Sequence, residues 1–561
     1  MSRVNIILIG IIAIAAIARL WLLGSVPNSL YWDEVSLGYN AFSISETLKD
    51  EHGHFMPILF EAFGDYKMPA YIYLTAIFVK IFGLNEFSVR IGSALMGIIT
   101  VGLVYYLTKE ILFYIKFNEQ FDKKVSIVSL VAAFLLAISP WHLQFSRTGF
   151  EANGGLLFCV AGLYFFLRAL RTNHKLLIVS ALSFVISCYF YRSILLFTPF
   201  LLLLLFIVFF KDLISKKLRK YTLVSIFIFI ALATPIFYES FFTKGSSRAN
   251  DVLVFSNLDQ KVSLFQMWAI QSGEGRIGNI VYNERFIYLN EIISNYLAHF
   301  SPSFLYTSGD PNPRHGPRNM GMEYIWGLPL LIAGVIVLAK SKGKGILILL
   351  GGLFIAPISA AVSIFAPHAL RSLNMVPFLS IITAIGGVYL FYSFQSRLRV
   401  IISCFFVIVA GFVIFSYVFN YYKVSIFLSA AEWGDGYKQM NEYVKDHYDE
   451  YDKIIISGHY WQPYAYTLFY TRYSPQKYQE NGNNYAYDKY LFGGTSWIQD
   501  GPPELGSVDL AKMAGYKKAL VVLSPDEYAQ QENPPGLLTE IKDINNKTVY
   551  FVGVVQRTED K

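Results

Sequence analysis

Asp33 and Glu34 are adjacent carboxylates that follow the first long apolar segment of the sequence. Neighbouring carboxylates can divide one proton abstraction, because one accepts the proton while the other orients the substrate or supplies charge. Asp33 is explained equally well as the cap of a helix expected over 35–48 at the membrane surface. The pair therefore indicates either a general base or the start of a helix, and both interpretations stay open.

Basic side chains occur at several positions where a lipid phosphate could lie. Lys67 belongs to an aromatic-rich stretch, 65–73, that predicts a segment at the level of the lipid headgroups. Arg147, Arg192 and Arg371 stand at the expected outer ends of spans, and a planar guanidinium can bind phosphate through two hydrogen bonds. Together with Glu151 they predict a site for an anionic substrate. Taken singly, Lys67 could be an ordinary headgroup anchor, and each arginine could snorkel or pair with a carboxylate such as Glu151.

A Pro- and Gly-rich stretch at 310–319 adds further polar side chains. Arg314, His315 and Arg318 could contact a sugar or a phosphate from this irregular segment. A single histidine without a partner at ligand spacing is weak evidence for metal, so we predict no metal site. Other histidines are scattered and receive no role, namely His52, His54, His142 and His299. A divalent cation could assist a leaving phosphate, but basic side chains can serve instead, and we expect no obligatory cofactor.

The composition around these residues is that of a membrane protein. The chain has 561 residues, of which 54% are hydrophobic and 16% charged, and its mean hydropathy is +0.42. The formal charge of +7 does not indicate nucleic acid as a partner, because Lys and Arg recur between apolar runs and form no basic domain. The three cysteines all lie in apolar segments, so neither a disulfide framework nor a thiolate metal site is expected.

About eleven segments are long and apolar enough to cross a bilayer core of about 30 Å as helices. They are expected near 5–24, 88–108, 125–140, 152–170, 175–191, 194–210, 221–239, 325–339, 345–364, 371–393 and 398–420. Connections rich in Lys and Arg alternate along the chain, and cytoplasmic loops hold this excess. We therefore expect a multi-pass plasma-membrane protein with its N-terminus in the cytoplasm and its C-terminus outside. A cleaved signal peptide could instead account for the first segment.

The expected outer face holds two large loops, 25–87 and 240–324, and a separate C-terminal domain. A transmembrane domain over 1–425 would precede an extracytoplasmic α/β domain over 430–561. Within that domain 434–451 has helical periodicity, 453–457 and 519–523 read as buried strands, and 539–544 with 550–555 reads as a hairpin. The fold class expected is a polytopic α-helical membrane protein with a small C-terminal α/β domain.

Taken as an ordered set, these residues resemble those of the C-type (GT-C) membrane glycosyltransferases. The similar families are the protein O-mannosyltransferases, the aminoarabinose lipid A transferases and the rhizobial lipopolysaccharide galacturonosyltransferases. The resemblance covers about the first 400 residues. It is carried by Asp33-Glu34, by Lys67 and Pro69 before Tyr71 and Tyr73, by the run 82–95, by Ser146-Arg147-Thr148, and by Arg371 followed by Pro377.

The resemblance implies an enzyme that inverts the sugar of a polyprenyl-phosphate donor onto an acceptor hydroxyl of a lipid, glycan or protein. Such a hexosyl- or pentosyltransferase would use Asp33 as base with Glu34 as its partner, and would hold the donor phosphate near Lys67 and Arg371. Two departures concern the donor pocket. Glu151 stands where many relatives have an Asp, and Met68 interrupts the usual Lys-Pro pair.

Two functions from other classes compete with this interpretation. A membrane transporter or lipid flippase would place ionisable residues near the middle of its spans, whereas the span interiors here are nearly free of charge. A scaffold or sensor would need few spans to anchor its outer domain. The sequence also has no phosphate-binding loop or dinucleotide fingerprint, so we expect the sugar to arrive on a membrane lipid.

Overall fold

The computed structural model describes residues 2–117, 119–243, 283–481, 486–493, 518–531 and 534–556, with short pieces at 253–254, 263–264, 267–268 and 271. Much of the expected outer loop 240–324 therefore lies outside the described residues. The chain divides into two compact units, which are described separately here. The helical unit comprises Met1–Trp21, Gly64–Ala70 and Ser93–Asn420, and the sheet unit comprises Leu22–Phe63, Tyr71–Gly92 and Tyr421–Lys561.

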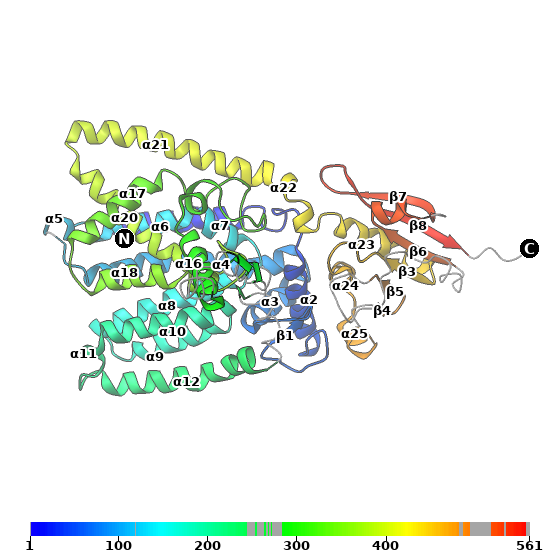
Figure 1. Cartoon of the computed structure of the whole chain (residues 1–561), viewed down its shortest axis with the longest axis horizontal. Helices are drawn as coiled ribbons and strands as arrows, with labels where there is room; N and C mark the ends of the chain where they lie inside the picture. The colour runs from blue at the N-terminus through cyan, green and yellow to red at the C-terminus, as the bar shows by residue number, and fades with distance from the viewer. Residues whose placement is uncertain are drawn as a thin grey trace, which may run out of the picture. The chain divides into compact units, whose positions relative to one another are not determined.

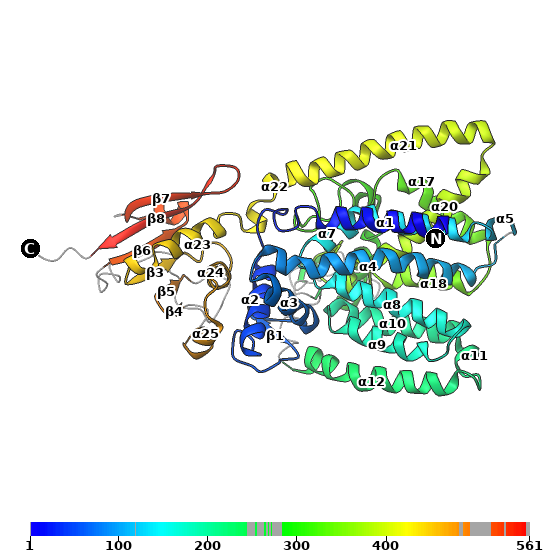
Figure 2. The same cartoon turned by 180° about the vertical axis from the view of Figure 1, so that it is seen from behind.

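α-Helices make up most of the helical unit (Figures 1 and 2). They are α1 (Arg3–Leu20), the larger part of α4 (Glu86–Phe113), α6 (Val125–Ile138), α7 (Pro140–Arg147), α8 (Ala152–Arg171), α9 (Leu176–Cys188), α10 (Arg192–Val208), α12 (Arg219–Phe242), α16 (Glu284–Ala298), α17 (Gly327–Lys340), α18 (Lys344–Ile355), α19 (Ile358–Ala361), α20 (Met375–Ser393) and α21 (Ser396–Phe419). Short helices α5 (Glu119–Asp122) and α11 (Phe210–Leu213) lie between them. In such segments every backbone polar group is satisfied within the helix, as a bilayer requires.

Seven helices of the described residues are long and apolar enough to cross a membrane. The number becomes eight if α6 and α7, which meet at an angle of 55°, form one bent span. The expected count of about eleven is not confirmed. Three of the expected spans form the shorter helices α9, α10 and α17, of 13, 17 and 14 residues, whereas a straight crossing needs about 20 residues.

Small residues allow close helix packing inside this unit. α17 and α20 meet where Gly334 faces Gly386, and a Cβ atom on Gly386 would collide with the Leu330 carbonyl oxygen and the Gly334 nitrogen. Lipid gives no hydrophobic driving force for such contacts, so close van der Waals approach has to stabilise them. Helix α21 instead exposes Phe405 and Phe412, as a lipid-facing surface would.

A six-stranded sheet forms the C-terminal part of the sheet unit. Its order is β4 (Ala486–Tyr487), β5 (Tyr490–Phe492), β3 (Lys453–Ile456), β6 (Lys518–Leu523), β8 (Thr548–Gln556) and β7 (Gly536–Lys542). β3 runs parallel to both β5 and β6, and the remaining pairs are antiparallel. The two buried strands and the hairpin expected from the sequence are thus confirmed. Ile455, Val521 and Leu523 belong to a buried apolar cluster of this sheet.

Helices of the sheet unit connect this sheet to the segment Leu22–Phe63. They are α2 (Trp32–Thr47), most of α3 (Pro69–Phe82), α22 (Ser425–Leu428), α23 (Tyr437–Asp446), α24 (Pro463–Thr471), α25 (Pro475–Asn481) and α26 (Pro525–Ala529). α2 packs against α24 and α25. Gly38 of α2 contacts the Phe469 ring so closely that a Cβ atom would not fit. The helix that begins beside Asp33 is therefore part of the sheet unit's core.

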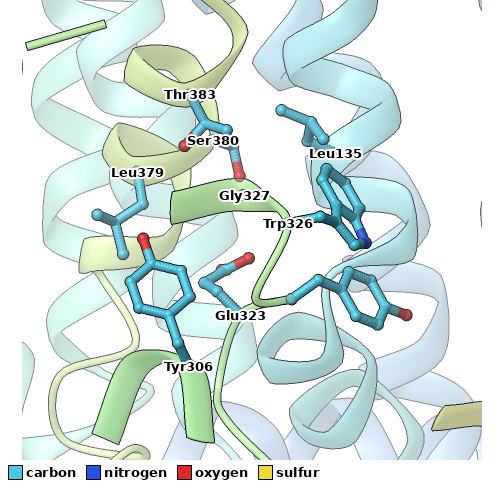
Figure 3. A pocket seen from close by; sticks show the side chains of 9 residues that line it. Leu135, Tyr306, Glu323, Trp326, Gly327, Leu379, Ser380 and Thr383 are labelled. Carbon is cyan, nitrogen blue, oxygen red and sulfur yellow. The ribbon is translucent and has the colours of Figure 1, made fainter. Parts of the chain in front are cut away.

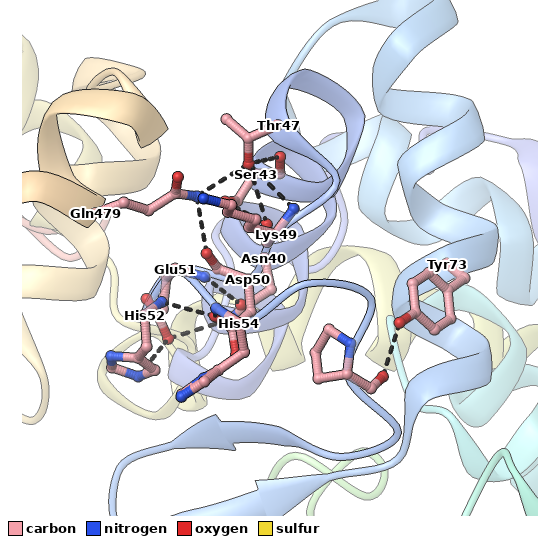
Figure 4. Close-up of polar contacts among 11 residues, drawn as sticks. Asn40, Ser43, Thr47, Lys49, Asp50, Glu51, His52, His54, Tyr73 and Gln479 are labelled. Carbon is pink, nitrogen blue, oxygen red and sulfur yellow. Dashed lines mark hydrogen bonds and ion pairs between the residues drawn. The ribbon is translucent and has the colours of Figure 1, made fainter.

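The end of α2 and the loop after it are bonded to α25 by the side-chain amide of Gln479 (Figure 4). Gln479 Nε2 donates hydrogen bonds to Ser43 Oγ, Thr47 Oγ1 and the Asp50 carbonyl oxygen, at 2.9, 3.0 and 2.9 Å. In the same loop, Glu51 accepts a bond of 3.1 Å from Asn40 Nδ2. Burial is the main reason that the pKa of Glu51 is raised to about 7.

Candidate functional site

Asp33 lies in the first turn of α2, and Tyr31 occupies the cap position before it. The helix begins at Trp32, so Asp33 is inside the helix and does not serve as its cap. Its side chain is half-buried. A carboxylate in the first turn lies near the positive end of the helix dipole. The geometry is therefore compatible with the expected base, while the cap interpretation loses its support.

Glu34 forms a buried ion pair with Arg90 in the sheet unit. Arg90 Nε donates to Glu34 Oε1 at 2.9 Å and Arg90 Nη2 donates to Glu34 Oε2 at 3.1 Å, with both side chains fully buried. The guanidinium also donates to the carbonyl oxygens of Leu23, Pro27 and Ser29. Such a saturated, two-bond pair holds the segment before α2 to the start of α4. Glu34 therefore positions the helix start that carries Asp33.

A separate group of charged residues gathers in the helical unit around the turn before α10. Arg192 is the first residue of α10 and donates from Nη2 to the Tyr66 carbonyl oxygen at 2.9 Å. The same nitrogen lies 3.4 Å from Asp65 Oδ1. Asp65 and Lys67 are the ends of the short strand β2 (Asp65–Lys67), and the next residues continue this segment. The Ala70 amide donates to the Tyr189 carbonyl oxygen at 3.1 Å, which fixes the Lys67 segment beside this turn.

Tyr191 is the residue at which the charges of this group converge. Its half-buried side chain has a raised pKa, first because of burial. Arg371 acts on the hydroxyl both as a positive charge and as a hydrogen-bonding partner, while Glu151 and Lys67 act on it through their charges. Residues that lie far apart in the sequence thus form one polar cluster. We call Lys67, Glu151, Tyr191, Arg192 and Arg371 the cationic cluster.

A second polar group of the helical unit consists of one carboxylate and two imidazoles. Asp310 Oδ2 accepts from His315 Nδ1 at 2.7 Å and from the Ala369 amide at 2.6 Å. The His315 and His368 rings lie 4.8 Å apart between centroids. Burial opposes ionisation of Asp310, but the His315 ring and the amide donors outweigh it and lower the pKa of Asp310. We call Asp310, His315 and His368 the histidine triad.

Arg371 is a member of the cationic cluster and also contacts the histidine triad. It lies three residues after His368, and its backbone amide donates to His368 Nδ1 at 3.4 Å. Burial first, and then the charges of Arg371 and His315, hold the pKa of His368 well below its ordinary value. Arg371 therefore connects the cationic cluster to the histidine triad within the helical unit.

The histidine triad has the donor set of a metal site. One ligand atom from each residue lies within 4.8 Å of the others. A carboxylate oxygen and two imidazole nitrogens suit Zn²⁺ or another divalent transition metal, and a neutral imidazole such as His368 is the form that binds metal. The Asp310–His315 bond would also fix the ring orientation, as carboxylates commonly do beside metal sites. The residues fit a metal, and the sequence alone did not predict this donor set.

Three of the expected site residues, Arg147, Arg314 and Arg318, belong to neither the cationic cluster nor the histidine triad. Arg147 is buried and donates from Nη1 to the carbonyl oxygens of Ala18 and Arg19, which ties α7 to α1. Arg314 Nε bonds to Asn312 Oδ1 at 3.2 Å, and Arg318 is exposed. His315 is brought into the triad. Sequence reasoning assigned no role to Tyr191, Asp310 or His368, although the last two lie within five residues of a residue that it named.

Glu323 lines a small cavity at the start of α17 (Figure 3). Tyr306, Ser380 and Thr383 also line it. Burial raises the pKa of Glu323 to about 8, and Ser139 Oγ donates to its carboxylate at 3.2 Å. The cavity volume is about 20 Å³, enough for about one water molecule. This cavity is therefore too small to hold a sugar or a lipid headgroup.

Comparison with known proteins finds one family model and several solved structures to which this chain is similar. Residues 66–238 match the dolichyl-phosphate-mannose-protein mannosyltransferase family, which is less than half of the chain. No curated protein matches the sequence. ArnT from Cupriavidus metallidurans, bound to undecaprenyl phosphate, is 11% identical and aligns over 100% of both chains with a TM-score of 0.54.

The Archaeoglobus fulgidus oligosaccharyltransferase has the same fold. Its complex with Zn and sulfate is 14% identical, with 97% of this chain and 72% of that chain covered at a TM-score of 0.52. In the form tethered to an acceptor peptide, the chain spans 63% of that enzyme's length, with a TM-score of 0.49. At these identities the likeness to the solved structures establishes the fold, and the chemistry has to be argued from the residues of this chain.

Proposed function

We propose that this chain, a multi-pass membrane protein of the C-type glycosyltransferase (GT-C) fold, transfers a sugar from a polyprenyl-phosphate donor to an acceptor hydroxyl with inversion. The observation that carries the proposal is the cationic cluster of the helical unit, where the Lys67 segment is bonded to the turn before α10 and Arg371 is a hydrogen-bonding partner of Tyr191. Two cations and a hydroxyl match the charge and hydrogen-bonding needs of a phosphate group. The undecaprenyl phosphate in ArnT and the dolichol phosphate in the archaeal oligosaccharyltransferase support this class of donor.

The proposed reaction is one direct displacement. The acceptor hydroxyl gives its proton to Asp33 while its oxygen attacks the anomeric carbon from the face opposite the phosphate. The bond between the anomeric carbon and the phosphate oxygen breaks, and its electron pair leaves with the polyprenyl phosphate. Lys67 and Arg371 stabilise the negative charge that develops on the departing oxygen. A positioned base typically contributes about 10²- to 10⁴-fold to such a rate.

A divalent cation is a further part of the proposal. Asp310, His315 and His368 would hold it, and when bound it supplies positive charge for the leaving phosphate. Arg371 is common to the surroundings of the triad and of Tyr191. The positive charge for the phosphate would then come from both groups.

The proposal includes an orientation in the membrane. The charge bias of the short connections favours an N-terminus in the cytoplasm, with the α/β domain over 430–561 outside. The donor sugar and the acceptor would then meet on the outer face, away from cytoplasmic nucleotide sugars. The transmembrane domain over 1–425 would supply the donor site.

The test is sugar transfer by the purified full chain in lipid nanodiscs. A panel of radiolabelled polyprenyl-phosphate hexoses and pentoses would be offered together with membrane lipids, glycans and peptides as acceptors. We expect transfer with one donor class, and we expect Asp33→Asn to reduce it at least a hundredfold at unchanged thermal stability. Asp449→Asn is the matched control, because Asp449 is an exposed aspartate of the same unit.

Two outcomes would contradict the proposal. One is unchanged transfer in Asp33→Asn, which would remove Asp33 from the reaction. The other is no transfer from any donor, together with movement of labelled lipid or solute across sealed vesicles. That second outcome would favour a transporter or flippase.

A further inference from the structure

Two tryptophans from distant parts of the sequence pack together in the sheet unit. The Trp32 and Trp461 ring centroids lie 5.4 Å apart with the ring planes inclined by 32°. Trp32 directly precedes Asp33, and Trp461 lies in the loop between β3 and α24. Trp461 remains 45% exposed. The pair therefore presents an accessible aromatic surface next to the proposed base.

The backbone on both sides of this pair is held by a second aromatic pair. The Tyr437 hydroxyl donates to the Trp461 carbonyl oxygen at 3.1 Å, and the Tyr466 hydroxyl donates to the Leu30 carbonyl oxygen at 3.1 Å. The Tyr437 and Tyr466 rings are stacked with centroids 3.8 Å apart. Both tryptophan segments are thus anchored while the Trp461 ring stays exposed. A rigid exposed aromatic group is typical of binding sites, because little conformational entropy is lost on binding.

Trp461 also lies where α/β sheets bind ligands. β3 is flanked by β5 and β6, and these strands run parallel. The loop after β3, residues 457–462, therefore stands at the carboxyl edge of the parallel strands, which is the usual place for ligand contacts in such sheets. The Ser457 amide donates to the Val522 carbonyl oxygen, and the His459 amide donates to Ser457 Oγ, so this loop is ordered.

We infer that Trp32 and Trp461 form the platform on which a sugar ring of a glycan acceptor stacks, next to Asp33. The inference rests on the proposed function and names its acceptor class as carbohydrate. The faces of an indole carry negative potential and attract the C–H groups of a sugar face, and the ring hydroxyls then point outward at the edge. A hydroxyl of the bound ring could then approach Asp33, the residue after Trp32. An acceptor without a sugar ring would gain little from the platform.

Binding can be measured independently of transfer, on the full chain in nanodiscs. Neutral oligosaccharides of two to four hexose or pentose units would be the probes, and saturation-transfer-difference NMR would report C–H protons that lie on an aromatic ring. The background would be Asp33→Asn, so that no turnover occurs. We expect saturable binding by at least one oligosaccharide, a loss of about tenfold or more in affinity with Trp461→Ala, and recovery of most of it with Trp461→Tyr.

Trp21→Ala supplies the matched control, because Trp21 is an exposed tryptophan at the end of α1. In transfer assays with native Asp33, Trp461→Ala should raise the acceptor KM about tenfold and leave the donor KM unchanged.

The inference is overturned if no oligosaccharide binds, or if Trp461→Ala leaves the affinity unchanged. It is also overturned if Trp461→Ala and Trp21→Ala weaken the oligosaccharide affinity equally, since the loss would then not be specific to Trp461. Oligosaccharide binding that depends on Trp461 without transfer from any donor would support the platform and refute only the proposed reaction.

Discussion

Arg90 and Glu34 form a fully buried ion pair with two hydrogen bonds, of 2.9 and 3.1 Å, between the start of α4 and the start of α2. The guanidinium also donates hydrogen bonds to three backbone carbonyl oxygens in the segment before α2, those of Leu23, Pro27 and Ser29. This pair distinguishes the two adjacent carboxylates of the sequence. Glu34 holds a buried structural contact, whereas Asp33 is half-buried in the first turn of α2 and remains the proposed base.

Glu34→Gln should therefore destabilise the protein. The substitution leaves the Arg90 charge buried without its counter-charge, and breaking a buried pair in this way costs about 3–5 kcal/mol. Glu46→Gln is the control, because Glu46 and Lys80 form an exposed pair 3.1 Å apart that should contribute less than about 1 kcal/mol. Thermal unfolding of the detergent-purified variants measures both effects. Equal unfolding midpoints for the two variants would show that the buried pair is not a stabilising contact.

Lys67→Gln should weaken donor binding. The change removes one positive charge from the cationic cluster while keeping a side chain of similar length. We expect the donor KM to rise about tenfold, with a smaller change in the acceptor KM. Lys445→Gln, a change at an exposed lysine of α23, should leave both constants unchanged. An effect of Lys67→Gln on the acceptor KM alone would exclude Lys67 from the donor phosphate site.

Tyr191→Phe tests whether Tyr191 positions Arg371. The substitution removes the hydroxyl that Arg371 approaches and leaves the ring in place. We expect donor KM to rise about three- to tenfold, and we expect Arg371→Gln to add little on top of it, because the two residues act as one unit. A double-mutant cycle measures this coupling. Fully additive losses in Tyr191→Phe and Arg371→Gln would show that the two side chains act separately.

The histidine triad should bind about one equivalent of Zn²⁺. Elemental analysis of the dialysed full chain would measure the stoichiometry, and His315→Ala and His368→Ala should each reduce it strongly. His447→Ala, a change at a histidine at the end of α23 whose Nδ1 contacts the Tyr443 carbonyl oxygen, should leave it unchanged. If His315→Ala, His368→Ala and His447→Ala all have the same metal content as the native protein, the triad is a hydrogen-bonded cluster without a metal.

Glu51→Gln should stabilise the protein at alkaline pH. The pKa of Glu51 is raised to about 7 in the folded state, from 4.5 for the unperturbed group, so the folded state holds the proton more tightly. The stability from this protonated form is fully present below pH 4.5 and is lost as the pH rises to about 7. A glutamine at this position would imitate the protonated acid and avoid that loss, which we expect to be on the order of 1–3 kcal/mol.

The corresponding measurement is the unfolding midpoint of both proteins between pH 5 and pH 8.5. The native protein should lose stability relative to Glu51→Gln as the pH rises, and the two curves should converge near pH 5. Glu450→Gln, an exposed change in the same unit, controls for general effects of charge. Parallel curves for the native protein and Glu51→Gln would show that Glu51 titrates normally.

Local features of the sequence determined the apolar helices and most strands of the sheet. Length and hydropathy alone predict a spanning helix such as Glu86–Phe113, and an unbroken run of strand-forming residues predicts the strand Lys518–Leu523. The same local view predicted a catalytic pair at 33–34 and a phosphate-binding lysine at 67. The expected count of about eleven spans is not confirmed, because length and hydropathy do not show where a helix ends: α9 ends at Cys188 after 13 residues.

Only the tertiary structure decided which of these residues act together. Glu34 looks equivalent to Asp33 in the sequence, and its role depends on Arg90, 56 positions away. Tyr191 and His368 carried no sequence signal, since their importance comes from Arg371 and His315 lying beside them. Charges interact through space at distances of a few ångströms, whatever their separation along the chain. The sequence by itself therefore determined the residue types and the membrane-spanning character, and the fold determined which charges converge.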